Sequence, residues 1–156
     1  MHNQKNIFLI GLMGTGKTTI GRQLSRKLKM EFYDSDRVIE ERTGADIPLI
    51  FEKEGEAYFR NVEKECLLEM GEKEMTIIST GGGTPCFFDN IDWMNENGMT
   101  VFLNPTVDIL FDRLKSETTH RPIISGKTDD VLRNFITAKL NSRLHFYEKA
   151  KIVIDV

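Results

Sequence analysis

Cysteine and long apolar runs are scarce in this sequence of 156 residues, and each absence argues against a class of protein. The only two cysteines, Cys66 and Cys86, match no metal-binding or redox spacing, which argues against a disulfide scaffold and a zinc module. No run approaches the roughly 18 apolar residues that span a bilayer. The first residues lead at once into an apolar run, without a signal peptide. We therefore expect free thiols, no membrane partner and a cytoplasmic location.

A large excess of charge is also lacking, because 21 basic residues stand against 24 acidic ones and the formal net charge is −3. Nucleic-acid-binding domains usually carry a basic surface, so we expect no nucleic-acid partner. The length predicts a single domain over 1–156, large enough to bury about two-thirds of its unfolded surface. No exposed apolar stripe stands out in the pattern, and we expect a monomer.

A glycine-rich stretch near the start gives the first positive indication of function. The phosphate-binding pattern G-x-x-x-x-G-K-[ST] is matched at every fixed position by residues 11–18, Gly-Leu-Met-Gly-Thr-Gly-Lys-Thr. An apolar run over 6–10 predicts a buried strand before this loop, and the apolar spacing over 19–28 predicts a helix after it. Backbone N–H groups and the helix N-terminus would surround phosphates. Lys17 would reach the β- and γ-phosphates and Thr18 would bind Mg²⁺, so we expect a nucleoside triphosphate ligand.

The rest of the chain alternates between expected strands and expected helices. Further strands are predicted over 31–34, 75–79, 99–103 and 151–155. Helices are predicted over 37–42, 49–54, 57–72, 90–97, 106–116 and 129–149. This alternation favours an α/β fold, in which helices cover both faces of a five-stranded parallel sheet. Ligands of such sheets bind beyond the carboxyl ends of the strands, so we expect 11–18, 34–36 and 81–83 to surround one cleft.

Two carboxylates follow the second expected strand. Alternate residues of a strand share a face, so we expect Asp34 and Asp36 to point together into the cleft. There they could hold Mg²⁺ through water, accept hydrogen bonds from substrate hydroxyls, or take a proton from an attacking hydroxyl. The alternative is that this Asp-Ser-Asp run only ends the strand and caps the next helix.

Three further features have two interpretations each. The glycines at 81–83 could let a ligand approach the backbone closely, or could form a plain flexible turn. Arg60 and Arg143 could bind a carboxylate or a phosphate, although their spacing fits surface arginines equally well. Arg121, in a polar segment, could bring positive charge to a transferring γ-phosphoryl group, or could be an ordinary loop residue.

In their order and spacing, these stretches resemble the shikimate kinase family. The resemblance rests on six motifs: the loop at 11–18, Asp-Ser-Asp at 34–36, Phe-Arg-x-x-Glu at 59–63, Gly-Gly-Gly at 81–83, Arg-Pro at 121–122 and Arg-x-x-x-Tyr at 143–147. It implies a three-layer P-loop NTPase fold with a substrate-binding segment at about 33–62 and a lid at about 113–126. It also implies ATP-dependent phosphorylation of the 3-hydroxyl of shikimate to shikimate 3-phosphate, toward chorismate and the aromatic amino acids, with ATP and Mg²⁺.

The family's functional residues carry over onto the matching positions of this sequence. The resemblance implies that the nucleotide is bound by Gly14, Thr15, Gly16, Lys17, Thr18, Thr19, Arg113 and Arg121. It implies that Mg²⁺ is held by Thr18 and, through water, by Asp34. It implies that shikimate is bound by Asp36, Arg60, Gly81, Gly82, Gly83 and Arg143. The catalytic residues would be Lys17, the general base Asp36 and the lid residue Arg121.

Two alternatives remain open beside this interpretation. One is another small-molecule kinase of similar fold, of the gluconate or nucleoside monophosphate type, although Asp-Ser-Asp suits a polyol better than a nucleobase. The other is a non-catalytic nucleotide-binding relative, against which the intact Lys17, Asp36 and Arg121 argue. Family members usually continue past the last strand into a loop that closes on adenine, whereas this sequence ends at Val156. Either this sequence is truncated or its tail is naturally short, so half of the adenine clamp is missing or is supplied by other residues, and the sequence leaves nucleotide affinity and base selectivity open.

Overall fold

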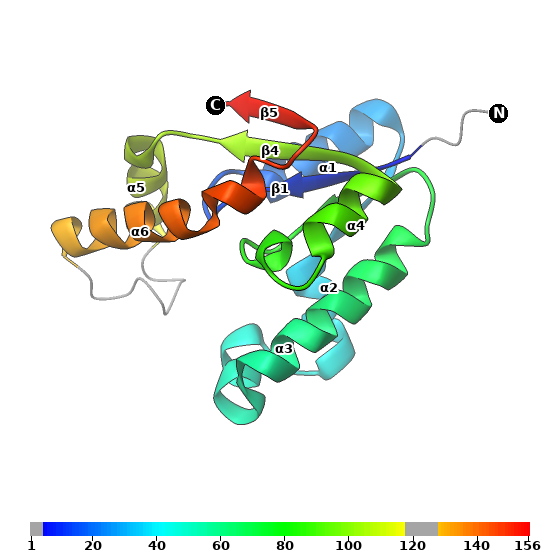
Figure 1. The fold of residues 1–156 in the computed structure, drawn as a ribbon, viewed down its shortest axis with the longest axis horizontal. Helices are drawn as coiled ribbons and strands as arrows, with labels where there is room; N and C mark the ends of the chain where they lie inside the picture. The colour runs from blue at the N-terminus through cyan, green and yellow to red at the C-terminus, as the bar shows by residue number, and fades with distance from the viewer. Residues whose placement is uncertain (1–4, 118–127) are drawn as a thin grey trace.

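The computed structural model describes residues 5–117 and 128–156 and contains one five-stranded parallel sheet (Figure 1). In chain order, the strands are β1 (Asn6–Ile10), β2 (Glu31–Asp34), β3 (Thr76–Ser79), β4 (Gly98–Asn104) and β5 (Ile152–Asp155). The helices are α1 (Lys17–Leu28), α2 (Ser35–Thr43), α3 (Ile47–Gly71), the 3-10 turn η1 (Thr84–Cys86), α4 (Asn90–Asn97), α5 (Val107–Ser116) and α6 (Asp129–Tyr147). The strands lie in the order β2-β3-β1-β4-β5, and every pairing is parallel. The predicted α/β fold is confirmed.

Apolar residues cover both faces of the sheet, as the alternation of side chains along a strand requires. On β1, Leu9 packs on the same face as Leu24 of α1, whereas its neighbour Phe8 belongs to the larger cluster on the opposite face. This larger cluster contains residues of α3, α4, α5 and α6, for example Leu67 and Ile136. The sheet is therefore the middle of three layers.

Helix termini explain where several elements begin and bend. Asp46 caps α3, because its carboxylate accepts a hydrogen bond from the Leu49 N–H at 2.9 Å. Gly55 interrupts the same helix with a φ of 83°, which separates the two helical stretches that the sequence predicts over 49–54 and 57–72. Among the described helices, none has both the length and the apolar character that a membrane span requires.

The last strand, β5, is an edge strand and is unlike the others. The side chains of Ile152, Val153 and Ile154 are between 42% and 49% exposed, whereas β1 and β3 are almost entirely buried. The strand itself is confirmed, but the expectation that no apolar stripe is exposed is wrong here. Within residues 5–117 and 128–156, no strand pairs with the outer side of β5, and an apolar run alone does not reveal this.

Candidate active site

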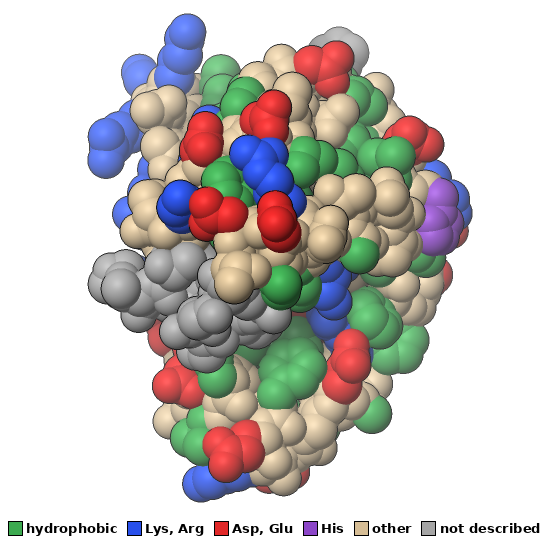
Figure 2. All heavy atoms as spheres, turned by 90° about the vertical axis from the view of Figure 1, so that its left-hand side faces the viewer, with side chains coloured by type: hydrophobic (Ala, Val, Ile, Leu, Met, Phe, Trp, Pro, Cys, Tyr) green, Lys and Arg blue, Asp and Glu red, His purple; other side chains and the backbone are tan. Residues whose placement is uncertain are grey.

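One cleft of about 640 Å³ opens at the carboxyl ends of the strands. The residues that line it are Met13, Gly14, Thr15, Gly16, Lys17, Thr18, Thr19, Ile20, Asp34, Asp36, Arg37, Glu40, Ser79, Thr80, Gly81, Gly82, Arg113, Glu117 and Val156. Figure 2 faces this end of the sheet and shows acidic and basic side chains interspersed over it. The predicted meeting of the glycine loop, the Asp-Ser-Asp run and the glycine triplet at one cleft is confirmed.

The glycine loop between β1 and α1 is shaped by positive backbone angles. Gly14 and Gly16 have φ values of 82° and 92°, in the left-handed region that glycine adopts most readily. The Nζ of Lys17 is buried and donates to the carbonyls of Gly11 and Leu12 at 2.5 and 2.9 Å. The amine is thus held at the centre of the loop, where a cation can meet a phosphate chain.

In the first turn of α1, the hydroxyl of Thr18 lies beside the carboxylate of Asp34. The Thr18 hydroxyl donates to Asp34 Oδ2 at 3.0 Å, and both residues line the cleft. In the described residues, no three His, Cys, Asp or Glu side chains gather as a metal cage. Magnesium in phosphoryl-transfer sites needs only one or two protein oxygens beside phosphates and water, so this pair fits that ion.

The structure corrects the reason why Asp36 points into the cleft. Asp36 does not lie on a strand face shared with Asp34, because β2 ends at Asp34 and Asp36 lies in the first turn of α2. Asp34 caps this helix by accepting the Asp36 N–H at 3.1 Å. The Asp-Ser-Asp run therefore caps a helix and also lines the cleft, so capping is not its only position in the structure, while its roles toward Mg²⁺, substrate and proton transfer stay predictions.

The carboxyl group of Asp36 is electrostatically unusual. Its pKa is raised from 3.8 to about 6, first by burial and then by the nearby carboxylates of Asp34 and Glu63, whereas Lys17 lowers it. Ionising a buried acid beside other carboxylates is costly, because water no longer screens the charges. A carboxyl group with a pKa near neutrality is suited to take a proton.

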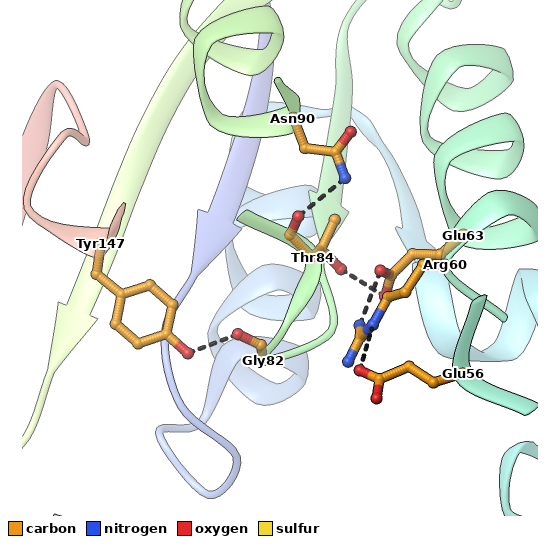
Figure 3. A network of polar contacts seen from close by, with 7 residues as sticks. All are labelled: Glu56, Arg60, Glu63, Gly82, Thr84, Asn90 and Tyr147. Atoms are coloured by element: carbon orange, nitrogen blue, oxygen red, sulfur yellow. Dashed lines mark hydrogen bonds and ion pairs between the residues drawn. The ribbon is translucent and has the colours of Figure 1, made fainter. Parts of the chain in front are cut away.

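Arg60 is buried on α3 rather than exposed on its surface (Figure 3). One guanidinium nitrogen donates to Glu63 Oε1 at 2.9 Å, and Nε donates to Glu56 Oε1 at 3.4 Å. The guanidinium also lies over the ring of Phe87, 3.9 Å from the ring centre. These partners fix a planar cation in one orientation, so the surface alternative does not hold for this arginine.

The glycine triplet after β3 is where the expected substrate-binding side chains converge. A Cβ on Gly81 would lie 2.9 Å from Asp36 Oδ1, and one on Gly83 would lie 2.7 Å from both terminal nitrogens of Arg60. A Cβ on Gly82 would lie 3.0 Å from a terminal nitrogen of Arg143. Each glycine thus leaves space for one functional side chain, which a plain flexible turn does not require.

The turn is held in place from two sides. The hydroxyl of Tyr147, whose ring is fully buried, donates to the Gly82 carbonyl at 2.5 Å. On the other side, Glu63 accepts the Thr84 hydroxyl at 2.9 Å, and Asn90 donates to the Thr84 carbonyl at 2.9 Å (Figure 3). Sequence reasoning assigned no role to Glu63, although its position one helical turn after Arg60 is a signal for an ion pair.

Not every predicted site residue reaches the cleft wall. Gly83, the last residue of the glycine turn, is not part of the cleft lining, and neither are Arg60 and Arg143, which lie beside that turn. Arg113 lines the cleft, and one of its nitrogens donates to the Gly14 carbonyl at 3.1 Å. Arg121, with most of the segment expected as a lid over 113–126, lies outside the described residues.

Comparison with known proteins assigns this chain to a family. Residues 13–156 match the family model described as shikimate kinase. A shikimate kinase of Bacteroides thetaiotaomicron is 48% identical over 149 residues, which cover 96% of this chain and 85% of that protein.

Solved structures agree with this match. The crystal structure of shikimate kinase from Bacteroides thetaiotaomicron superposes with a TM-score of 0.94 at 47% identity, over 97% of this chain and 86% of that one. The Acinetobacter baumannii shikimate kinase in complex with shikimate gives a TM-score of 0.86 at 36% identity, over 98% and 84% of the two chains. The chain therefore belongs to the shikimate kinase family.

Proposed function

We propose that this chain transfers the γ-phosphoryl group of ATP to the 3-hydroxyl of shikimate, giving shikimate 3-phosphate and ADP. The observation that carries the proposal is the glycine triplet, which brings Asp36, Arg60 and Arg143 together beside the phosphate-binding loop. Shikimate carries one carboxylate and three hydroxyls, so it needs cations at one end and a hydrogen-bond acceptor at the other. Family membership and the shikimate complex of a relative support the same substrate.

The nucleotide half of the site is the loop with the first turn of α1. Backbone N–H groups of Gly14, Thr15, Gly16, Thr18 and Thr19 surround the phosphates, at the positive end of the helix. Lys17 exchanges its bonds to the loop carbonyls for bonds to the β- and γ-phosphates. Arg113, fixed on the Gly14 carbonyl, packs on the adenine base, and Arg121 brings positive charge to the phosphates.

Thr18 and, through water, Asp34 would hold Mg²⁺. When bound, the ion neutralises charge on the β- and γ-phosphates. The hydrogen bond between Thr18 and Asp34 keeps both oxygens at the edge of the cleft, so the site is prepared before the nucleotide arrives.

In the acceptor half, Asp36 is the general base. Its carboxylate accepts the proton of the 3-hydroxyl while that oxygen attacks the γ-phosphorus, and ADP leaves on the opposite side. Arg60 and Arg143 bind the shikimate carboxylate, and the N–H groups of Gly82 and Gly83 donate to the same ligand. Because Glu56 and Glu63 already orient Arg60, little side-chain freedom is lost on binding.

We also propose a domain organisation, an oligomeric state and a location for the protein. Residues 1–156 form a single domain in which the segment at about 33–62 binds shikimate and the segment at about 113–126 is a lid. One chain supplies both halves of the described cleft, which supports a monomer as the catalytic unit. Two free cysteines support a cytoplasmic location, and the interspersed charges near the cleft support action without nucleic acid or membrane.

The direct test is ADP release from Mg·ATP in the presence of shikimate, gluconate, AMP or no acceptor. We expect release that depends on shikimate, with phosphorus NMR locating the new ester at the 3-oxygen. Release that depends on gluconate or AMP would assign the chain to another small-molecule kinase. Measurable ATP binding without release to any acceptor would instead support a non-catalytic relative.

A further inference from the structure

The aromatic ring of Phe87 lies against the guanidinium of Arg60 rather than in the apolar core. Phe87 is half-buried, and within residues 5–117 and 128–156 it belongs to neither of the two apolar clusters that pack on the sheet. Its ring centre lies 3.9 Å from Cζ of Arg60. Aromatic rings attract a cation placed over their face, so the contact is favourable, and core packing alone does not account for the position of this ring.

Hydrogen bonds of the turn after β3 fix where Phe87 lies. The 3-10 turn η1 follows the glycine triplet directly, and its Cys86 N–H donates to the Gly83 carbonyl at 2.9 Å. Phe87 ends this turn with an extended backbone, and its carbonyl accepts the N–H of the buried Asn90 at 3.2 Å. The ring is therefore carried by the same short segment whose last glycine leaves space for Arg60.

The same segment contacts α3 at two positions that are one helical turn apart. Phe87 contacts Arg60, and Asp89 accepts a hydrogen bond from Lys64 Nζ at 2.6 Å. This Nζ also lies 5.0 Å from the centre of the Phe88 ring. Residues four apart on a helix share a face, so Arg60 and Lys64 present two cations to one side of the turn. The two contacts hold the turn against this face of α3.

The two carboxylates that bind Arg60 restrain only the edge of its guanidinium. Nε donates to Glu56 and Nη1 donates to Glu63, and the N–H groups of a guanidinium lie in its plane. Bonds along one edge leave the plane free to tilt about that edge, whereas a ring against its face opposes the tilt. Nη2 has no hydrogen-bond partner among the described residues, and a Cβ on Gly83 would lie 2.7 Å from it. A donor is thus left at the glycine turn.

We propose that Phe87 is a positioning residue for substrate binding, whose ring holds the Arg60 guanidinium in the plane from which Nη2 meets the shikimate carboxylate. The inference rests on the proposed function, since that function assigns Arg60 to this carboxylate. The carboxylate takes no part in phosphoryl transfer and keeps its contacts throughout the reaction. The ring therefore contributes to shikimate affinity and not to the rate of the chemical step.

Phe87→Leu tests this role, because it removes the aromatic face and keeps a large apolar side chain. A cation–π contact of this kind is worth about 3–30-fold in affinity, so the KM for shikimate should rise by that factor. The kcat and the KM for ATP should stay unchanged. Phe87→Tyr keeps the aromatic face and should restore the KM for shikimate. Steady-state kinetics with each substrate varied in turn provide the measurement.

Phe88→Leu is the matched control, because it makes the same change at the adjacent, 57% exposed ring, which contacts Lys64 rather than Arg60. It should leave the KM for shikimate unchanged. An equal rise in both variants would assign the effect to the whole turn and overturn the proposal. A Phe87→Leu variant that loses kcat or ATP affinity to the same extent would also overturn it, as would a Phe87→Tyr variant that behaves like Phe87→Leu.

Proton NMR of the ligand-free chain tests the contact without turnover. Protons over an aromatic face resonate upfield, so the Arg60 Nε–H signal, assigned by its loss in Arg60→Lys, should move downfield in Phe87→Leu and stay in place in Phe88→Leu. A signal that does not respond to Phe87→Leu would overturn the proposal. Failure of the kinase assignment would appear differently, as no shikimate-dependent ADP release by the unmodified chain. That result would overturn the role in shikimate binding together with the assignment, while the NMR shift would still report the contact.

Discussion

The two halves of the cleft are built in opposite ways. The phosphate-binding loop of the nucleotide half is one continuous stretch of chain, in which glycine angles shape the loop and Lys17 bonds to carbonyls only five and six residues before it. The acceptor half joins side chains from α2, α3 and α6 around a turn after β3. One half depends on local backbone conformation, and the other depends on the tertiary fold.

This difference decides how each half responds to change. A local loop tolerates changes elsewhere in the molecule, because its neighbours in sequence hold it. In the acceptor half, Glu63 is 2% exposed and bonds to both Arg60 and Thr84, so one substitution there disturbs several partners. We therefore expect acceptor-half substitutions to separate substrate effects from nucleotide effects, and the predictions below test that separation.

The largest effect is expected from Asp36→Asn. The amide cannot take a proton from the 3-hydroxyl, so kcat should fall by about 10²–10⁴-fold, the usual contribution of a general base. The affinity for ATP should change little, because Asp36 belongs to the acceptor half. Single-turnover kinetics together with calorimetric titration of ATP measure the two effects separately.

The exposed Asp92→Asn on α4 is the matched control for loss of one carboxylate. It should leave both kcat and ATP affinity unchanged. Near-normal turnover of Asp36→Asn would remove this residue from proton transfer. An equal loss of ATP affinity would show that the two halves of the cleft are not separable.

A smaller effect is expected from Arg60→Ala. A hydrogen bond to a charged group contributes roughly 1.5–3 kcal/mol, so the KM for shikimate should rise by about 10–100-fold. The KM for ATP should change far less. Arg60→Lys keeps the charge but loses the planar pair of donors, and should recover only part of the affinity. Steady-state kinetics with each substrate varied in turn provide the measurement.

The ion pair between Arg60 and Glu63 gives Arg60→Ala a second possible effect, and a variant of Glu63 can separate the two. Removing Arg60 leaves Glu63 buried without its cation, close to Asp36. The double variant Arg60→Ala with Glu63→Gln removes that charge. If it restores the shikimate KM, the effect of Arg60→Ala comes from the unpaired carboxylate rather than from lost substrate contact.

The same contrast explains how far the sequence alone could predict the molecule. Strands, helices and the phosphate loop depend on local patterns, and the five-stranded parallel sheet follows from their alternation. The burial of Arg60 depends on Glu56, Glu63 and Phe87, and spacing alone does not reveal Phe87 as its neighbour. Asp36 was predicted to line the cleft because it would share a strand face with Asp34, and this reason was wrong. The strand β2 ends at Asp34, which caps α2, and the strand pattern does not reveal where that change occurs.

The edge position of β5 could not be predicted either. The run over 152–154 is as apolar as a buried strand, and only the strand order shows that β5 lies last in the sheet among the described strands. Apolar patterning predicts which residues form a strand, whereas their exposure depends on what packs beside them. The family resemblance predicted the functional class without this information, because those of its motifs that the structure describes lie in or beside the cleft.

The smallest expected effect is a pH dependence that originates in the acceptor half. The pKa of Asp36 is raised to about 6 by burial and by neighbouring carboxylates, so the base is protonated below this pH. Since kcat/KM reports the free enzyme, its value for shikimate should be about tenfold lower at pH 5 than on the plateau above pH 7. ATP also titrates in this range, so carbon NMR of the Asp36 carboxyl in the ligand-free chain should confirm a midpoint near pH 6. Glu63→Gln removes one nearby charge and should lower that midpoint, whereas a midpoint near 3.8 in the unmodified chain would contradict the electrostatic origin.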